Sequence, residues 1–347
     1  MKVVTFFNNK GGVGKTTLAV NTAAYIVKKL KKRVLFVDAD PQSNATQMVV
    51  PEQDWESIYS DNRNQRTLKN VFRPIFEGTP EINSKIYVYN KKVNSEYRFY
   101  FDIILGHPEM SANEDLLSDA WQKYDFGSLR KTNWLYQLAN KFSDEYDIIF
   151  VDVGPSLGAL NRSILLNSDY IVTPMGSDVF SLMGISNIGT WIKKWRKIYN
   201  QRLESARTDN DDNNFDIQAE RLLINLHCEK KTQLCGYSIL QYNAKKGNKY
   251  KNGRRAVKAY DVIISQIPKV IEDNLDFLIP DKLKGRINLG DVPYLNSIIP
   301  MSQSSNTPLF DLNSESGVRG SQFGVVKKTE NMLKEISENI LNNIGEA

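Results

Sequence analysis

The chain has 347 residues, 41% of them hydrophobic, and a formal net charge of +5, so its length and apolar content suffice for one large or two smaller globular domains. Its two cysteines and two histidines exclude a disulfide scaffold and disfavour a transition-metal site. Because it shows no run of eighteen apolar residues and no basic-then-apolar leader, we expect a cytoplasmic protein.

The first thirty residues predict a strand, a glycine-rich loop and a helix. Residues 3–7 are short and apolar, as a buried parallel strand is, and apolar residues recur at helical spacing from Val20 to Leu30. Between them, residues 8–17 read Asn-Asn-Lys-Gly-Gly-Val-Gly-Lys-Thr-Thr. A glycine-rich loop that ends in Lys-Thr between a strand and a helix is typical of phosphate binding.

Each residue type in this loop suits a bound phosphate. Glycine tolerates positive φ and lets backbone N–H groups approach phosphate oxygens, while the helix N-terminus and Lys15 add positive charge. The Thr16 hydroxyl is a suitable ligand for Mg²⁺ on the β- and γ-phosphates. We therefore expect these residues to bind the nucleotide: Gly11, Gly12, Val13, Gly14, Lys15, Thr16 and Thr17.

Lys10, directly before the glycines, makes the loop unusual. The resulting Lys-Gly-Gly-Val-Gly-Lys-Thr-Thr resembles the deviant Walker A motif of the ParA/MinD family of ATPases. The resemblance implies ATP and Mg²⁺, and a homodimer with ATP sandwiched at its interface, across which Lys10 reaches the partner's nucleotide. Lys10 and Lys15 would then both stabilise the transferring phosphoryl group as catalytic residues; the alternative for Lys10 is a solvated lysine.

A second buried strand is predicted at residues 33–38, and Asp38-Ala-Asp40-Pro-Gln42 ends it. Open α/β sheets keep their chemistry at the carboxyl ends of the strands. The resemblance implies that Asp38 orients or activates the attacking water, which makes it catalytic, and that Asp40 lies near the waters of the metal.

Residues 43–141 show weaker patterns. Residues 86–89 and 97–105 predict two strands of a hairpin, joined by the polar residues 90–96. Residues 102–119 resemble the strand, turn and acidic helix of many ParA-like proteins. Because the spacing from Asp40 to the next motif exceeds that of compact family members, we interpret residues 51–96 as an insertion.

Residues 146–158 read Tyr-Asp-Ile-Ile-Phe-Val-Asp-Val-Gly-Pro-Ser-Leu-Gly. They predict a buried strand that ends in Asp152, and the resemblance implies that Asp152 is the Walker B carboxylate at the Mg²⁺ site. The following turn resembles the family's switch segment, except that Gly154 replaces the first proline. Since glycine frees the backbone where proline would fix it, the substitution predicts a less rigid switch.

Residues 170–174 predict a further strand, and residues 178–199 contain a helix whose end carries Lys193, Lys194, Arg196 and Lys197. These cations suit a helix C-terminus as well as a ligand. Residues 222–226 predict a fifth apolar strand, and the resemblance implies Asn225 near the adenine. The acidic residues 209–220 lack the glycine that a calcium loop requires, so we expect a solvated loop there.

Residues 230–258 form the sharpest charge feature outside the loop, with nine cations and no Asp or Glu. Tyrosines and glycines interleave with them and indicate a loop or ribbon. Such a stretch is either a solvated insertion or a contact for the phosphates of duplex DNA, and the resemblance favours DNA. The candidate DNA-binding residues are Lys230, Lys231, Lys245, Lys246, Lys249, Lys251, Arg254, Arg255 and Lys258.

Residues 288–300 resemble the last strand of the family and the loop beside the base, and the resemblance implies Pro293 as a nucleotide contact. From residue 326 onward, Leu333, Ile336, Ile340 and Ile344 form one stripe of a helix. MinD-like members bind membranes through a C-terminal helix, but that requires a basic polar face, and here glutamates outnumber lysines. We therefore expect this stripe to pack on the protein, and we expect no membrane contact.

Together these patterns predict a doubly wound, mainly parallel α/β sheet of the ParA/MinD type, formed by residues 1–347 as one domain with insertions at 51–96 and 204–258. The function that the resemblance implies is a slow ATPase whose ATP-bound homodimer binds DNA without sequence preference and positions a plasmid, chromosome locus or other cargo. A protein partner would stimulate hydrolysis. Two alternatives stay open: a MinD-like ATPase at a membrane surface or in complex assembly, and a metabolic ATP-dependent ligase.

Overall fold

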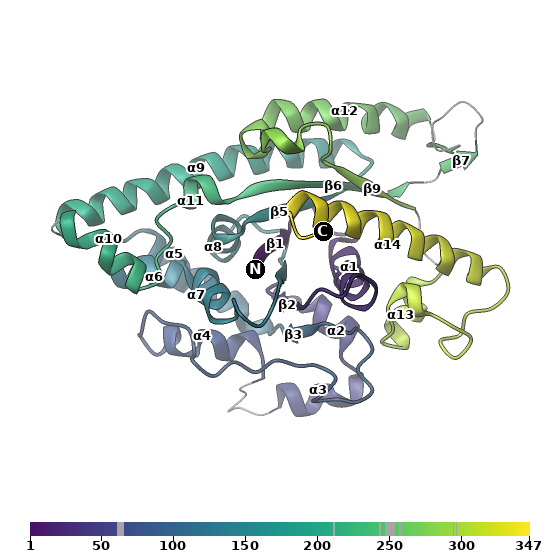
Figure 1. The fold of residues 1–347 in the computed structure, drawn as a ribbon, viewed down its shortest axis with the longest axis horizontal. Coiled ribbons are helices and arrows are strands. Elements are labelled where there is room, and N and C mark those ends of the chain that lie inside the picture. The colour runs from purple at the N-terminus through teal and green to yellow at the C-terminus, as the bar shows by residue number, and fades with distance from the viewer. Residues whose placement is uncertain are drawn as a thin grey trace.

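The computed structural model describes residues 1–60, 66–210, 212–242, 244–246, 254–256, 258–293, 295 and 297–347. Its centre is a seven-stranded parallel sheet in the order β3-β2-β4-β1-β5-β6-β9 (Figure 1). This confirms the predicted α/β fold. The strands are β1 (Lys2–Phe6), β2 (Val34–Asp38), β3 (Asp102–Ile104), β4 (Ile148–Asp152), β5 (Tyr170–Gly176), β6 (Gln233–Tyr242) and β9 (Asn288–Pro293).

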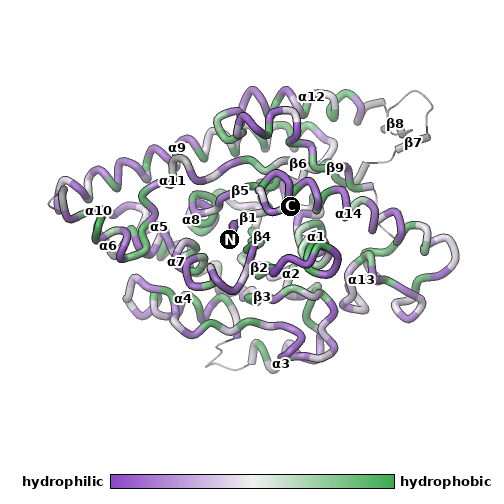
Figure 2. Tube along the Cα trace, viewed as in Figure 1, coloured by the Kyte–Doolittle hydropathy of each residue, from purple (hydrophilic) through white to green (hydrophobic). Residues whose placement is uncertain are grey.

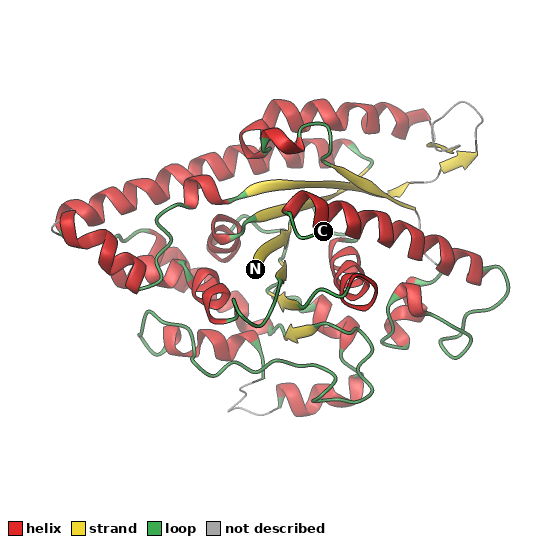
Figure 3. Ribbon diagram, in the orientation of Figure 1, coloured by secondary structure: helices red, strands yellow, loops and turns green. Residues whose placement is uncertain are grey.

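Helices cover both faces of this sheet, as the red ribbons on either side of the yellow strands show (Figure 3). One face packs against α1 (Lys15–Leu30), α2 (Asn44–Val49), α3 (Glu52–Tyr59), α13 (Ile299–Ser304) and α14 (Gln322–Ile344). The other packs against α4 (Leu68–Phe76), α5 (Asn113–Trp121), α6 (Phe126–Thr132), α7 (Trp134–Lys141), α8 (Ala159–Asn167), α9 (Val179–Asp209), α10 (Asp212–Arg221) and α12 (Lys258–Leu275). A short helix, α11 (Cys228–Lys231), precedes β6.

The apolar strands divide their side chains between two hydrophobic cores. In β2, Leu35 and Val37 face the α4 to α12 side, whereas Val34 and Phe36 face α1 and α14. Successive strand residues point to opposite faces, so a strand covered on both sides must be apolar throughout. Figure 2 shows the resulting hydrophobic stretches along the central strands and α1.

The predicted hairpin of residues 86–105 is wrong in extent. Only Tyr89 and Ile103 pair, through two backbone hydrogen bonds of 2.8 and 2.9 Å, while β3 joins β2 in parallel. Tyr89 and Asn94 of the turn also bind α3, because Asp54 accepts hydrogen bonds from the Tyr89 hydroxyl at 2.8 Å and from Asn94 Nδ2 at 2.7 Å. The strand, turn and helix predicted for residues 102–119 are confirmed.

Three predictions for residues 193–226 are wrong. Helix α9 continues to Asp209, so the cations at 193–197 lie within it rather than at its end. The expected acidic loop is largely α10, because Phe215 is buried and stacks on Phe126 with ring centroids 5.2 Å apart. Residues 222–226 turn instead of forming a strand, with Leu223 at φ 55°, and β6 supplies the strand beside β5.

The C-terminal helix behaves as its stripe predicts. Leu333, Ile336, Ile340 and Ile344 are buried in the core shared with α1. Residues 51–96 also build the core, because Leu68 and Phe72 of α4 are fully buried. Within the described part of the chain, no helix combines the length and apolarity that crossing a bilayer would need.

Gly189 marks where α9 packs tightly on α12. A Cβ atom added there would lie 2.4 Å from the Asn274 carbonyl oxygen, so we expect Gly189→Ala to force the two helices apart and to lower the free energy of unfolding by about 1–3 kcal/mol. Urea unfolding measures the change. The matched control is Gly324→Ala in α14, where a Cβ meets nothing within 4 Å and should be neutral or stabilising; equal effects would contradict the packing argument.

Candidate nucleotide site

The glycine-rich loop links β1 to α1 at the carboxyl edge of the sheet. Gly12 and Gly14 adopt φ values of +73° and +70°, the left-handed region that glycine enters without steric cost. A Cβ atom on Gly11 or Gly12 would meet nothing within 4 Å, so the loop surface is open. Residues 10–17 line a cavity of about 770 Å³ there, and the structure thus groups the predicted phosphate-binding residues.

The Asp152 carboxylate joins the loop to β4. Lys15 Nζ donates to Asp152 Oδ1 at 2.9 Å, and Thr16 Oγ1 donates to Oδ2 at 2.6 Å. All three come together because β1 and β4 pair in parallel with Phe6 opposite Asp152. The ion pair is buried, and it fixes both loop side chains against the end of the sheet.

The oxygen atoms at this edge fit Mg²⁺ bound through a nucleotide. Among the residues that the structure describes, no three His, Cys, Asp or Glu side chains converge as a metal site, whereas Mg²⁺ usually takes one or two protein oxygens and completes its shell with water and phosphate. The Thr16 hydroxyl and the Asp152 carboxylate are such oxygens, and Asp40 lines the same cavity. The residues therefore fit the predicted ion.

Asp38 lies deeper than the sequence indicates and does not line the cavity. Its Oδ2 accepts hydrogen bonds from the backbone N and Oγ1 of Thr46 at 2.8 and 2.7 Å, while its buried Oδ1 has no protein partner. Burial, and then the nearby charge of Asp152, raise the pKa of Asp38 to about 7. Near neutral pH this carboxyl group is thus poised between its two protonation states.

Asp40 lies close to Gly154, in the turn that follows β4. Its Oδ1 accepts a hydrogen bond from Gln42 N at 2.9 Å, and burial raises its pKa. A Cβ atom on Gly154 would lie only 3.1 Å from that oxygen, so close approach of Asp40 accounts for the glycine. The switch turn itself is tied down, because Asn161 Nδ2 donates to the carbonyls of Gly154 and Ser156 at 2.8 and 2.7 Å.

Lys10 occupies the rim of the cavity and forms an ion pair within its own chain. Its Nζ donates to Asp178 Oδ2, and Asp178 caps the start of α9 by accepting from Ser181 N at 3.2 Å. Partial burial raises the pKa of Asp178, but the Lys10 hydrogen bond and charge outweigh it and hold the pKa below its ordinary value. Lys10 is therefore a paired lysine in this structure.

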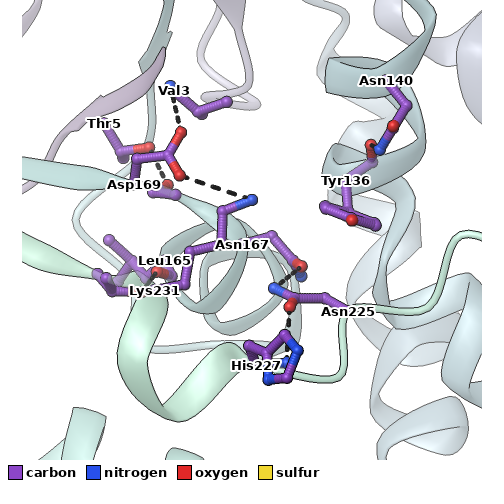
Figure 4. Close-up of polar contacts among 12 residues, drawn as sticks. Val3, Thr5, Tyr136, Asn140, Leu165, Asn167, Asp169, Asn225, His227 and Lys231 are labelled. Atoms are coloured by element: carbon purple, nitrogen blue, oxygen red, sulfur yellow. Dashed lines mark hydrogen bonds and ion pairs between the residues drawn. The ribbon is translucent and has the colours of Figure 1, made fainter. Parts of the chain in front are cut away.

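Asn225 does not belong to this site. Its amide bonds Asn167 Oδ1 at 3.3 Å and its Oδ1 accepts from His227 N at 3.0 Å (Figure 4). Asn167 ends α8, just before β5 begins, so this network lies at the amino edge of the parallel sheet, opposite the glycine-rich loop. The adenine prediction for Asn225 is wrong, since it relied on a strand at 222–226 that does not form.

Pro293 ends β9 and lines a small, mainly apolar hollow with Gly14, Thr17 and Leu18. The hollow adjoins the first turn of α1, so the structure brings Pro293 beside the loop.

Several residues of the site carry no sequence signal that we recognised. Gly106 follows β3, and a Cβ atom there would come within 2.7 Å of Ser43 Oγ and 2.9 Å of Asp38 Cγ; a glycine just after a predicted strand was the available signal. Trp55, Gln303 and Asn306 line the cavity. They come from segments far apart in the sequence, so spacing could not have identified them.

The predicted DNA-binding residues lie on several different elements of the structure. Lys231 Nζ lies 3.7 Å from Asp169 Oδ1 and over the Tyr136 ring, at the amino edge with Asp169 (Figure 4). Lys245 and Lys246 lie in β7 (Ala244–Lys246), which pairs antiparallel with Arg254 and Arg255 in β8 (Arg254–Ala256). This ribbon follows the carboxyl end of β6. Because β6 has ten residues and a strand rises about 3.3 Å per residue, that end lies about 30 Å from Gln233, where the strand begins. Lys258 begins α12, Lys230 lies in α11, and Lys249 and Lys251 fall outside the described residues.

The amino-terminal part of the chain is similar to a known family and to curated relatives. A family model described as an AAA domain matches residues 1–205. The virulence plasmid ParA family protein pGP5-D of Chlamydia psittaci is 28% identical over 54% of this chain and 62% of its own length. The chromosome partitioning protein ParA of Myxococcus xanthus is 30% identical over 54% of this chain and 56% of its length. The chain thus spans less than two thirds of these relatives.

Solved structures resemble the whole chain. Protein DIP2308 of Corynebacterium diphtheriae is 29% identical, with a TM-score of 0.74 and 99% of each chain covered. The ParA of pNOB8, solved with nonspecific DNA, is 18% identical, with a TM-score of 0.52 over 99% of this chain and 98% of that one. At that identity the second likeness concerns the fold.

The raised pKa of Asp38 predicts a pH-dependent stability. Between the ordinary carboxyl pKa and about 7, the folded chain holds a proton that the unfolded chain has released, so this group lowers stability as pH rises through that range. Asp38→Asn removes the effect. The thermal midpoint of the variant, measured without nucleotide, should therefore rise by a few degrees relative to wild type between about pH 5 and about pH 8.

Asp147→Asn is the control for this prediction. The hydrogen bond from Arg33 lowers the pKa of Asp147. The contribution of this carboxylate to the stability of the fold therefore no longer changes with pH above its ordinary pKa. The difference from wild type should then be the same at both pH values. Parallel pH curves for Asp38→Asn and wild type would show that Asp38 does not carry a raised pKa.

Proposed function

The chain belongs to the ParA/MinD family of P-loop ATPases, and from this we propose that it is an ATP-driven switch that dimerises on Mg-ATP, binds DNA in that state and reopens after hydrolysis. One observation carries the proposal: Lys15, Thr16 and Asp152 meet at one edge of the sheet, with Asp40 on the same cavity and Asp38 buried next to it. This is the set of groups that phosphoryl transfer requires.

In the proposed reaction, water attacks the γ-phosphorus of ATP and the bond to the β–γ bridging oxygen breaks, giving ADP and phosphate. Mg²⁺ neutralises phosphate charge when bound, and Thr16 and Asp152 are the residues that would hold it, with Asp40 near its waters. Backbone N–H groups of the loop and Lys15 bind the phosphates. Asp38, with a pKa near 7 and one unpaired oxygen, orients the attacking water.

Lys10 acts on the nucleotide of a second copy in this proposal. Its ion pair with Asp178 must then break, so an isolated subunit keeps its second cation away from the reaction. A shared site of this kind keeps hydrolysis slow until two subunits meet. The lifetime of the ATP-bound dimer would set how long the switch stays on.

The β7–β8 ribbon is the proposed DNA contact. Its register sets Lys245 opposite Arg255 and Lys246 opposite Arg254, which places four cations within two short strands. Such a set suits phosphates without base readout. One structural neighbour, the ParA of pNOB8, was solved with nonspecific DNA, and two relatives are described as chromosome-partitioning proteins. We propose that the switch positions a DNA or other cargo and that a protein partner stimulates its hydrolysis.

The nucleotide base is proposed to lie between Trp55 and α13. Trp55 Nε1 donates to the Val50 carbonyl at 3.0 Å, which holds the indole ring on the cavity wall. Asn306, which follows α13, donates from Nδ2 to the Met48 and Val50 carbonyl oxygens. The wall thus combines an aromatic surface with amide groups beside the phosphate loop. Stacking of a base on an aromatic ring contributes about 1–3 kcal/mol.

Trp55→Ala should therefore weaken ATP binding about tenfold or more and leave the binding of inorganic triphosphate unchanged, because the loop alone holds the phosphates. Calorimetric titration measures both ligands. Trp191→Ala is the control, since Trp191 lies on α9 and does not line the cavity. An equal loss for ATP and triphosphate would place the base elsewhere.

The DNA role is tested by binding random-sequence duplex DNA with ATP, with ADP and without nucleotide, each over a salt series. We expect binding only with ATP, with a log–log salt slope of about −0.9 for each phosphate neutralised. The double variant Lys245→Ala/Arg255→Ala should make this negative slope shallower by about two units, because it removes two cations. Lys91→Ala/Lys92→Ala, two exposed cations outside the ribbon, should leave it unchanged.

A protein that dimerises with ATP but binds no DNA in any nucleotide state would contradict the DNA role. Vesicle co-sedimentation and a search for protein partners would then decide for the MinD-like alternative. Turnover that requires a defined metabolite would instead favour a ligase.

A further inference from the structure

A second cavity, of about 370 Å³, lies against α3 and shares no lining residue with the nucleotide cavity. Glu52 and Trp55 of α3 line the nucleotide cavity, whereas Asp54 and Ser57 line the second one. Residues three apart lie on the same face of a helix, so α3 separates the two cavities. The volume falls in the range of about 300–1,000 Å³ that is usual for small-molecule sites, and we therefore asked which ligand the lining fits.

The Asp54 carboxylate is held at this cavity through one of its two oxygens. Oδ2 accepts hydrogen bonds from the Tyr89 hydroxyl at 2.8 Å and from Asn94 Nδ2 at 2.7 Å. Tyr89 is only 2% exposed, so the network is anchored in the core. Within the part of the chain that the structure describes, Asp54 Oδ1 has no hydrogen-bond partner and no cation forms an ion pair with Asp54. One carboxylate oxygen is thus fixed in place and available to a ligand.

Glu96 is the second carboxylate of the cavity, and Asn94 positions it as well. Asn94 Oδ1 accepts a hydrogen bond from Glu96 N at 2.8 Å, so a single amide group binds Asp54 through its nitrogen and residue 96 through its oxygen. Gln53 Nε2 lies 3.5 Å from Glu96 Oε2. Among the described residues no cation pairs with Glu96. The cavity therefore holds two carboxylates at positions that one side chain fixes relative to each other.

Arg66 places a positive charge on the same cavity. Its guanidinium carbon lies 5.8 Å from the centroid of the Tyr87 ring, and its NH1 atom lies 3.5 Å from the Ser57 carbonyl oxygen. Burial raises the pKa of Tyr87, and the charges of Arg66 and Asp54 shift it further in opposite directions. A fixed cation and a fixed anion are thus both close to the Tyr87 hydroxyl.

We propose that this cavity binds a free basic α-amino acid, of which L-lysine is the simplest probe. An α-amino acid carries an ammonium group and a carboxylate on one carbon atom, which suits Asp54 and Arg66 on either side of the Tyr87 hydroxyl. The planar guanidinium of arginine matches a carboxylate in geometry as well as in charge. Glu96, which is more exposed, then binds the cation at the end of the ligand's side chain.

The charges of the lining select among amino acids. Its described charged residues are two carboxylates and one guanidinium, and a basic amino acid carries the complementary set of two cations and one carboxylate. A neutral amino acid leaves Glu96 without a counter-ion, and an acidic one brings a second carboxylate towards it, which is repulsive. The assignment does not depend on ATP hydrolysis or on a second subunit.

The test is calorimetric titration of the nucleotide-free full chain with L-lysine and with three analogues that each lack one charged group. Cadaverine lacks the carboxylate, norleucine lacks the side-chain ammonium and 6-aminohexanoate lacks the α-ammonium. We expect L-lysine to bind with a dissociation constant on the order of 1 mM or lower. Each analogue should bind at least about tenfold more weakly, because it leaves one charged group of the cavity unpaired.

Two variants assign the groups. Asp54→Asn keeps an oxygen for Tyr89 and Asn94 but loses the charge, so it should no longer distinguish L-lysine from 6-aminohexanoate. Arg66→Gln should likewise no longer distinguish L-lysine from cadaverine. A general loss of structure would weaken all four ligands alike and would not remove one distinction at a time. The matched control is Glu56→Gln, an exposed carboxylate of the same helix that does not line the cavity, and it should bind L-lysine as wild type does.

The proposal is overturned if wild type binds none of the four compounds, or binds all four equally. Tighter binding of cadaverine than of L-lysine would assign the cavity to alkylamines and overturn the amino-acid site. Wild-type binding of L-lysine by both Asp54→Asn and Arg66→Gln would place the ligand elsewhere. None of these results bears on the proposed ATPase, because every titration is made without nucleotide.

Discussion

The hydrogen-bonded ion pair of Asp152 with Lys15 and Thr16 is the interaction on which the site depends. A fully buried carboxylate is costly unless it is paired, and here both oxygens are satisfied by the phosphate-binding loop itself. The parallel pairing of β4 with β1 and β2 holds the loop, Asp152 and Asp38 at one edge of the sheet. Register between three short apolar strands therefore decides where the chemistry can occur.

Crowding of carboxyl groups at this edge has a direct electrostatic consequence. Asp38 lies opposite Asp152 in the β2–β4 register, and only Asp152 has a cation in contact. The proton affinity of the unpaired group rises, because burial and the neighbouring negative charge both disfavour its ionised form. Buried carboxyl groups with a raised pKa beside a cavity are common at functional sites.

The start of the long helix α9 and the β7–β8 ribbon are two separate surfaces at different distances from the nucleotide site. The start of α9 is held against the loop through Gly184 and Asp178, whereas the ribbon follows the carboxyl end of β6, two strands away from β1. A surface next to the loop suits contact between subunits. A basic ribbon beyond the sheet suits a ligand much larger than a nucleotide.

The sequence alone was sufficient for the strand-loop-helix at the N-terminus, for Asp38, Asp40 and Asp152 at strand ends, and for the buried stripe of α14, because each is a local pattern whose period or spacing has a direct physical cause. Tertiary structure decided the rest. The apolar run at 222–226 turns instead of pairing because β6 occupies the place beside β5, and this removes Asn225 from the site. The basic stretch is divided because β6 lies within it and carries the chain from the amino ends of the strands to their carboxyl ends. Trp55, Gly106 and Asp178 reach the site only through long-range packing, which no local period encodes.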